Sequence, residues 1–348
     1  MYPYEHGGET YDKEVTLDFS ANINPFGLPE GVKKALVKGM DTFHVYPDQH
    51  CVKLREDLAD KLVIGDKHLI IGNGASDIIF RICFALKPGK ALLPAPTFSE
   101  YEKALRTAGC DIDYYYLKEE DKFCLTEEFI KSLTEDLDIV FLCNPNNPVG
   151  NILEKELVKK ILQVCKMKDI FLVMDECFLD FTSHHPSDSL LAYIKENEKL
   201  LILKAFTKFY AMAGLRLGYG ICGDRALIKA MEHAGPSWNV SIPAQIAGSA
   251  ALKEEAYEAA TYDWLLKERT FLYEGLLNLE LTVYKPSANY IFFKGTEKLY
   301  EEMLEKGILL RQCANYRGLS GEYYRIAVKT RKENEQLLKA IKEWREHA

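Results

Sequence analysis

The sequence lacks the features of several classes of protein. No apolar run is long enough to cross a bilayer, and the first residues, MYPYEHGGETYDKE, contain no basic segment followed by an apolar core. Acidic residues outnumber lysine and arginine by 52 to 44, and no basic stripe with interleaved aromatic residues occurs. These absences predict a cytoplasmic protein that binds neither membranes nor nucleic acid.

Cysteine is present, but not in a binding pattern. The nine cysteines are scattered singly, mostly within apolar runs, and no C-x-x-C pair occurs. Small buried hydrophobic side chains explain this distribution better than disulfides or zinc ligands do. We therefore expect neither a disulfide framework nor a metal site.

The middle of the chain alternates short apolar runs with amphipathic helical stretches such as residues 154–167. Runs that are apolar throughout are typical of strands covered on both faces. The pattern predicts an α/β domain built on a largely parallel sheet. The runs end near five residues: Pro96, Pro145, Phe178, Phe206 and Cys222.

The last hundred residues follow a different pattern. Residues 242–279 predict one or two long helices, and strands, a helix at 296–306 and a charged helix from about residue 331 come after them. A chain of 348 residues is long enough for roughly two domains. We expect three parts: an N-terminal arm with part of the small domain at 1–35, a large domain at 36–250, and a stem helix with a small α+β domain at 251–348.

In open α/β sheets, ligands gather outside the carboxyl ends of the strands, so the residues that follow apolar runs are candidates for a site. After HLII comes GNGASDII, where Gly72 and Gly74 permit tight backbone geometry and Ala75, Ser76 and Asp77 begin a helix. Free amides and the helix dipole at such a start suit a phosphate. An ordinary strand-to-helix turn is the alternative.

Three further runs end in polar residues. Asn144, Asn146 and Asn147 lie in the proline-containing loop CNPNNPVG, where asparagines can also cap turns. Asp175 ends an apolar run, and an N-cap is its alternative, although the following ECFLDF is not typical of a helix start. Lys208 follows LLILKAFT, and a lysine at a strand end is usually only solvated.

The combination of these strand ends favours one cofactor. A phosphate-binding helix start, a buried acid, a rigid asparagine loop and a strand-end lysine are together the parts that hold pyridoxal phosphate. In such a site Lys208 would form an imine with the cofactor, and Asp175 would pair with the pyridine nitrogen. Arg216 would bind the cofactor phosphate, a dianion for which a guanidinium is suited.

Four motifs, GNGASD, NPNNPVG, MDECFLDF and TKFYAMAGLRLGY, give the chain a resemblance to a known family. It resembles, essentially end to end, the fold-type I pyridoxal-phosphate enzymes of the class I/II aminotransferase superfamily. The resemblance implies a large domain with a mostly parallel seven-stranded sheet flanked by helices, plus a smaller α+β domain. The chain is most similar to the branch that contains histidinol-phosphate aminotransferase and threonine-phosphate decarboxylase. HGG at 6–8, DFSANINPFG and the lysine motif favour the decarboxylase.

The resemblance implies a role for each matching residue. Lys208 would form the imine and afterwards move protons, and Asp175 would keep the pyridine nitrogen protonated. Asn147 would hydrogen-bond the ring hydroxyl, and Phe98 would stack on the ring face. The cofactor phosphate would be held around the helix start by a group of five residues: Gly74, Ala75, Ser76, Thr207 and Arg216.

The resemblance also implies a partner subunit and a substrate. Tyr46 of HVYPDQH matches a tyrosine that reaches the phosphate from the neighbouring subunit, which implies a homodimer with shared sites. Arg325 of YYRIAV matches the arginine that grips the substrate carboxylate, and an outward residue of an alternating strand is the alternative. His6, Asn24 and Arg311 are candidates for the phosphate end of the substrate.

Two residues depart from the family pattern. Many members have tyrosine at the position of Phe178, where its hydroxyl supports the ring oxygen, so only Asn147 is left for that task. Ala205 stands where the family usually has serine or threonine against the phosphate, which removes one hydrogen bond of about 0.5–1.5 kcal/mol. We expect weaker cofactor retention.

The residues leave the reaction itself open. Loss of the α-proton leads to transamination and loss of the carboxylate to decarboxylation, and the orientation of the substrate decides between them. We expect an enzyme that acts on a small phosphorylated amino acid, with threonine-phosphate decarboxylase first and a histidinol-phosphate type aminotransferase second. A non-catalytic binding protein on this scaffold is a third hypothesis, which the presence of Lys208 and Asp175 disfavours.

Overall fold

The computed structural model of the chain describes residues 6–182 and 185–347. Its largest element is a seven-stranded sheet in the order β2-β8-β7-β6-β5-β3-β4. Six strands run in one direction and β8 runs against them, which confirms the predicted mostly parallel sheet. The strands are β2 (Leu69–Gly72), β3 (Lys90–Ala95), β4 (Asp111–Tyr116), β5 (Ile139–Cys143), β6 (Phe171–Asp175), β7 (Leu200–Ala205) and β8 (Gly218–Cys222).

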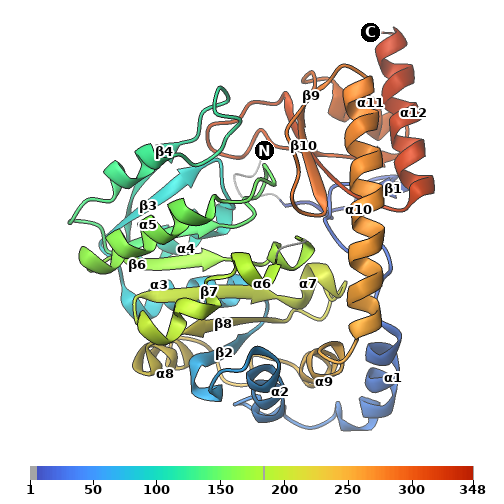
Figure 1. The fold of residues 1–348 in the computed structure, drawn as a ribbon. Helices are drawn as coiled ribbons and strands as arrows, with labels where there is room; N and C mark the ends of the chain where they lie inside the picture. Colours follow the sequence, from blue (N-terminus) through green and yellow to red (C-terminus); the bar gives the residue numbers. More distant parts are fainter. Residues whose placement is uncertain (1–5, 183–184, 348) are drawn as a thin grey trace.

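Helices cover both faces of this sheet (Figure 1). Successive side chains of a strand point to opposite faces, so the apolar runs need apolar cover on both sides. On one face the core includes α2 (Val52–Leu62), α5 (Lys155–Met167) and α9 (Ile242–Ala251). On the other it includes α3 (Ala75–Leu86), α4 (Ser99–Thr107) and α8 (Arg225–His233). The predicted helix at 154–167 is α5, which Glu154 caps by accepting bonds from the amides of Glu156 and Leu157.

A smaller antiparallel sheet has the strand order β12-β13-β10-β9. Its strands are β9 (Thr282–Val283), β10 (Tyr290–Lys294), β12 (Arg311–Gln312) and β13 (Tyr323–Ala327). The helices α11 (Leu299–Glu305) and α12 (Arg331–His347) contribute to its core. A two-residue strand near the N-terminus, β1 (Leu17–Asp18), pairs in parallel with β11 (Ile308–Leu309) and so ties the N-terminal segment to this sheet.

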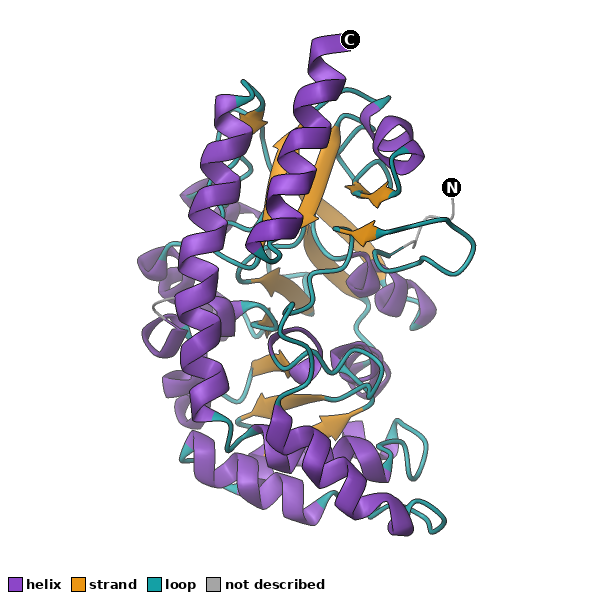
Figure 2. Cartoon of the chain, turned by 90° about the vertical axis from the view of Figure 1, so that its right-hand side faces the viewer, coloured by secondary structure: helices purple, strands orange, loops and turns teal. Residues whose placement is uncertain are grey.

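The two sheets are joined along one side by α10 (Glu255–Asn278), a helix of 24 residues and therefore about 36 Å long. Figure 2 shows α10 beside both sheets, with the small sheet above the strands of the large one. Residues 242–279 thus form two helices, α9 and α10, as one of the two sequence-based options had it. α1 (Glu30–Gly39) packs on α9. The division at residues 35 and 250 stays a prediction.

Two α-helices of the fold are very short. α6 (His185–Asp188) and α7 (Phe206–Phe209) are single turns, and α7 follows β7 directly. Within residues 6–182 and 185–347, no helix combines the length and apolarity that crossing a membrane requires. In the same ranges, no cluster of three or more His, Cys, Asp or Glu side chains is arranged to hold a metal ion.

Candidate active site

A cavity of about 450 Å³ opens at the carboxyl ends of β5, β6 and β7. The start of α3, the N-terminal segment and β13 close its other sides, so both sheets contribute to it. Ten of the fourteen residues predicted for the site line it: His6, Ala75, Ser76, Phe98, Asn147, Asp175, Thr207, Lys208, Arg216 and Arg325.

The start of α3 forms an anion cradle. Its N-cap is Gly74 at φ 80°, and no side chain caps the helix, so the first amides keep their capacity to bind a ligand. A Cβ on Gly74 would lie 2.6 Å from Arg216 Nη2, and a Cβ on Gly218 would lie 2.5 Å from the Ala75 nitrogen. Glycine is therefore needed at both positions, because the guanidinium and β8 approach the helix start this closely. Arg216 itself has φ 59°, a left-handed conformation uncommon for arginine.

Lys208 lies in the single-turn helix α7, immediately after β7, and lines the cavity. Burial, together with the nearby Arg325 and Arg216 guanidinium groups, lowers the pKa of Lys208 from 10.5 to about 8. A lysine with such a pKa is partly neutral near physiological pH, and a neutral amine is the form that attacks a carbonyl group.

Asp175 is the last residue of β6 and is only 5% exposed. Its Oδ2 accepts a hydrogen bond from the Tyr101 hydroxyl at 2.5 Å, and its Oδ1 accepts one from the Cys177 amide at 2.9 Å. A carboxylate has about four acceptor positions, so two protein donors leave room for a further N–H. The carboxylate fits the protonated ring nitrogen of a bound pyridine.

Asn147 and Arg325 meet at the opposite side of the cavity. Arg325 is 6% exposed, donates through Nη1 to Asn147 Oδ1 at 2.6 Å, and donates through Nη2 to the Ser20 carbonyl at 2.9 Å. Among the residues that the structure describes, its buried Nε has no acceptor. A buried guanidinium with an unsatisfied N–H is the feature expected of a carboxylate-binding arginine.

These groups fit pyridoxal phosphate. The cavity has the size of a small-ligand site. It holds an anion cradle, a reactive amine, a buried carboxylate and an aromatic wall at Phe98. Each part corresponds to one chemical feature of the cofactor: phosphate, aldehyde, ring nitrogen and ring face.

Four predicted site residues lie elsewhere. Gly74 is the N-cap of the cradle helix but does not line the cavity, and Tyr46 is 78% exposed, with its ring 4.7 Å from that of Trp238. Arg311 lines a neighbouring cavity of about 350 Å³ that shares His6, Gly7 and Ser20 with the main one.

Asn24 is the fourth of these residues, and it is not placed to meet a substrate. Its Nδ2 donates to the Phe209 carbonyl and the Thr261 hydroxyl, and its Oδ1 accepts from the Phe26 amide. Its main-chain N–H donates to the Lys208 carbonyl at 3.1 Å. Asn24 therefore supports the backbone around the lysine, because every polar group of its amide is already used by the protein.

Sequence reasoning missed several cavity residues. Asn22, 1% exposed, lines the cavity with both amide atoms unpartnered among the described residues, and it lies only two positions from the predicted Asn24. Tyr101 does not line the cavity but donates to Asp175 from behind its wall of lining residues, three positions after Phe98, and that one-turn spacing in the PTFSEY motif could have found it. Glu100 and Tyr316 carried no such signal. Phe178 and Ala205 line the cavity without a hydroxyl, as the sequence dictates.

The chain matches known proteins over nearly all of its length. Residues 14–341 match the model of the family described as aminotransferase class I and II. The sequence is 40% identical to the threonine-phosphate decarboxylase of Salmonella typhimurium, over 98% of this chain and 97% of that protein. It is 31% identical to histidinol-phosphate aminotransferase 2 of Archaeoglobus fulgidus, over 98% of this chain and 97% of that protein.

A solved structure shows the same similarity. The histidinol-phosphate aminotransferase from Clostridium acetobutylicum aligns with a TM-score of 0.90 at 33% identity, over 95% of this chain and 100% of that chain. The family match spans both sheets, and the cavity between them holds the parts that the cofactor needs. The chain belongs to the class I and II aminotransferase family, and it is an enzyme of fold type I that uses pyridoxal phosphate.

Proposed function

We propose that the protein is a threonine-phosphate decarboxylase. In this reaction the bond between the α-carbon and the carboxylate of L-threonine O-3-phosphate breaks, carbon dioxide leaves, and a proton takes its place on the α-carbon. The similarity to the Salmonella typhimurium decarboxylase, at 40% identity over 98% of the chain, supports this assignment over the 31% and 33% identities to two histidinol-phosphate aminotransferases.

The positions of two arginines support a substrate that has two anionic groups. Arg311 on β12 pairs in register with Arg325 on β13. Residues opposite each other in an antiparallel pair point to the same face, so the two side chains are neighbours. Arg325 lines the main cavity and Arg311 the cavity beside it, with His6 on both. One arginine is positioned for a carboxylate and the other for a phosphate.

Different side chains bind the substrate and transfer the proton. When bound, pyridoxal phosphate supplies an electron sink for the bond broken at the α-carbon. Arg325 holds the substrate carboxylate in the buried cavity, and the remote phosphate fixes which bond is aligned for cleavage. Lys208, with its pKa of about 8, can deliver a proton to the α-carbon and recover one from water.

One experiment separates decarboxylation from transamination. The holoenzyme is incubated with L-threonine phosphate alone, and separately with histidinol phosphate plus 2-oxoglutarate, while carbon dioxide and glutamate are measured. We expect carbon dioxide from threonine phosphate without a keto acid. Glutamate formation with threonine phosphate left untouched would replace this proposal with the aminotransferase.

The phosphate end gives a second arm of the same experiment. L-Threonine should react far more slowly than its phosphate, and Arg311→Ala should narrow that difference. Arg345→Ala is the matched control, because Arg345 pairs with Glu280 and lines neither of the two cavities. Equal rates for phosphorylated and plain substrates would reject both phosphate-specific functions.

We further propose a homodimer with shared sites, in the cytoplasm. Tyr46 is exposed beside Trp238, itself 49% exposed, and such aromatic surface suits burial against a second copy. Mixing Tyr46→Ala with Lys208→Ala subunits tests the shared site. Each variant alone should be nearly inactive, whereas mixed dimers should regain activity because one of their two sites is intact. No regain, with mixed dimers demonstrated, would exclude sharing.

A further inference from the structure

The cavity contains a hydroxyl that sequence reasoning did not anticipate. Among the described residues that line the cavity, Tyr316 is the only tyrosine, whereas Phe98 and Phe178 carry no polar group. Tyr316 is 6% exposed, and its hydroxyl lies 3.2 Å from Asn147 Oδ1. It comes from the loop between β12 and β13, not from the large sheet.

The two neighbours of Asn147 settle the orientation of its amide. Arg325 can only donate, so the atom 2.6 Å from its Nη1 must be the amide oxygen. The Tyr316 hydroxyl approaches the same oxygen and therefore donates to it. With both lone pairs of Oδ1 used, Nδ2 is turned the other way, and no described residue accepts a hydrogen bond from it. Its two N–H groups are left for a ligand.

The loop that carries Tyr316 is held on both sides. The Tyr316 amide donates to the Cys313 carbonyl at 3.0 Å, and the Arg311 guanidinium lies 5.5 Å from the centre of the Tyr316 ring. The next residue, Arg317, donates to both carboxylate oxygens of Glu102 on α4 and stacks 4.1 Å from the Tyr114 ring. The hydroxyl is thus fixed in place before any ligand binds, which limits the entropy lost on binding.

We propose that Tyr316 is a positioning residue that acts through Asn147, orienting and polarising its amide so that Nδ2 donates to the ring oxygen of the cofactor. This inference rests on the proposed function, because it needs pyridoxal phosphate in the cavity. It also supplies an answer to the missing hydroxyl at Phe178: Tyr316 supports the same ring oxygen indirectly, from the other sheet.

The physical effect is cooperative. An amide whose oxygen accepts from a guanidinium and a hydroxyl becomes a stronger donor at its nitrogen, because successive hydrogen bonds polarise one another. A stronger donor draws more of the negative charge of the ring oxygen toward Asn147. Less of that charge is then left to hold the proton on the nitrogen that Lys208 contributes to the bound cofactor, so this proton is lost at lower pH.

The test is a pH titration of the visible absorption of the bound cofactor in Tyr316→Phe. Removing one hydroxyl should raise the midpoint by roughly half a pH unit, since an indirect hydrogen bond has been lost. Two charged groups contact the pair, Arg311 and Arg325, and both are unchanged in the variant. So are the other charged or titratable residues of the cavity lining, which are His6, Glu100, Lys103, Cys143, Asp175, Cys177, Lys208 and Arg216. Tyr323→Phe is the matched control, because its hydroxyl donates to Glu119, which is not among the residues lining the cavity.

A double variant separates positioning from general packing. If Tyr316 acts through Asn147, adding Tyr316→Phe to Asn147→Ala should move the midpoint no further. A normal midpoint in Tyr316→Phe, or an equal shift in both backgrounds, would overturn the role of Tyr316 while the wild-type titration leaves the cofactor assignment intact. A wild-type holoprotein with no titrating band would instead overturn the proposed function, and this role with it.

Discussion

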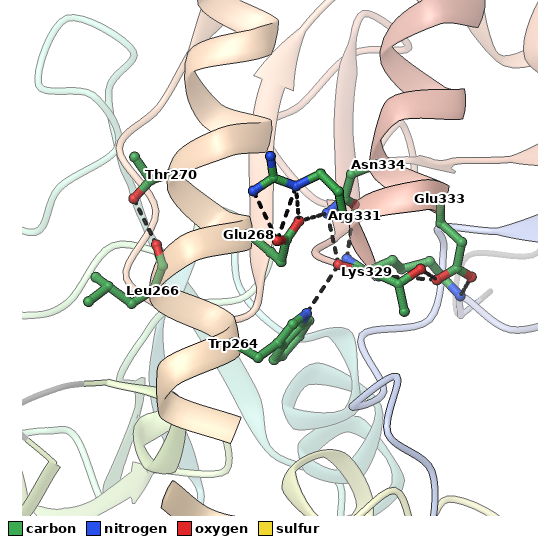
Figure 3. Close-up of polar contacts among 9 residues, drawn as sticks. Trp264, Leu266, Glu268, Thr270, Lys329, Arg331, Glu333 and Asn334 are labelled. Atoms are coloured by element: carbon green, nitrogen blue, oxygen red, sulfur yellow. Dashed lines mark hydrogen bonds and ion pairs between the residues drawn. The ribbon is translucent and has the colours of Figure 1, made fainter. Parts of the chain in front are cut away.

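At the junction of α10 and α12, the Glu268 carboxylate accepts from both Nε and Nη2 of Arg331 and from Asn334 Nδ2 (Figure 3). From the part of the chain that the structure describes, the Asp175 carboxylate in the cavity accepts just one hydroxyl and one amide. Both carboxylates are buried, at 8% and 5% exposure, so burial alone does not distinguish them. The two carboxylates differ in how many hydrogen bonds they accept from the protein.

The polar groups at the junction of α10 and α12 bond to one another. Asn334 also donates to the Lys329 carbonyl and accepts from its amide, and the Trp264 ring N–H donates to the same carbonyl (Figure 3). The cavity, in contrast, is lined by four basic side chains, Lys103, Lys208, Arg216 and Arg325, but by two carboxylates, Glu100 and Asp175. Glu100 already pairs with His6 and Lys103. A region whose polar groups are all bonded within the chain stabilises the fold. A region with an excess of one charge is suited to bind a ligand of the opposite charge.

The largest expected effect is that of Lys208→Ala. The variant should fold, because a lysine at a strand end adds little packing, yet it should show no turnover, because the amine that we propose bonds the cofactor and moves protons is gone. Carbon dioxide release and thermal unfolding measure the two halves of this prediction. Substantial turnover in a folded Lys208→Ala protein would contradict the assignment of Lys208 as the residue that bonds the cofactor.

Asp175→Ala should reduce activity by orders of magnitude while some cofactor still binds. In the role that we propose, the carboxylate would stabilise the protonated ring nitrogen and hence the negative charge that develops during either candidate reaction. Steady-state rates, together with cofactor content by absorbance, test this. A near-normal rate would show that Asp175 is a structural carboxylate like Glu268.

Glu268→Ala should have the opposite profile. We expect a loss of about 2–3 kcal/mol in the free energy of unfolding, since a buried, multiply bonded carboxylate is lost while Arg331, 48% exposed, stays solvated. Activity per folded molecule should be unchanged. Urea unfolding and rates at low temperature measure the two effects. A fall in rate without a fall in stability would mean that the junction also positions Arg325, four residues before Lys329.

The strand-end residues were predictable from the sequence for a physical reason. Parallel strands bring their carboxyl ends to one edge, so Asn147, Asp175 and Lys208 had to converge once the apolar runs were recognised as strands. The mostly parallel sheet and the helices of the second half followed from periodicity in the same way.

Residues that reach the cavity from distant elements were not predictable. Tyr316 meets Asn147 across 169 positions, and no local pattern encodes which loop closes over a strand end. Asn22 and Asn24 are two positions apart in SANINP, and in an extended segment such residues point to the same side. Sequence alternation therefore could not show which of the two lines the cavity. The choice is made by packing, which places Asn24 against Phe209 and Thr261.

The smallest expected effect tests the charge excess of the cavity in the absence of cofactor. The pKa of Lys208 is lowered to about 8 in the folded protein, so between about pH 8 and 10.5 the unfolded chain binds more protons than the folded one. Stability therefore rises with pH across this window and is lost as pH falls, down to a constant level below pH 8.

Lys208→Met removes this dependence of stability on pH. The cofactor-free variant should be more stable than the cofactor-free wild type by about 1–2 kcal/mol at pH 7.5, a value reduced by water in the open cavity, and the gap should close toward pH 10.5. Lys118→Met, at a side chain 62% exposed, is the control and should show no such trend. A gap for Lys208→Met that is constant with pH, measured by urea unfolding, would show that neither burial nor the neighbouring guanidinium groups lower the pKa of Lys208.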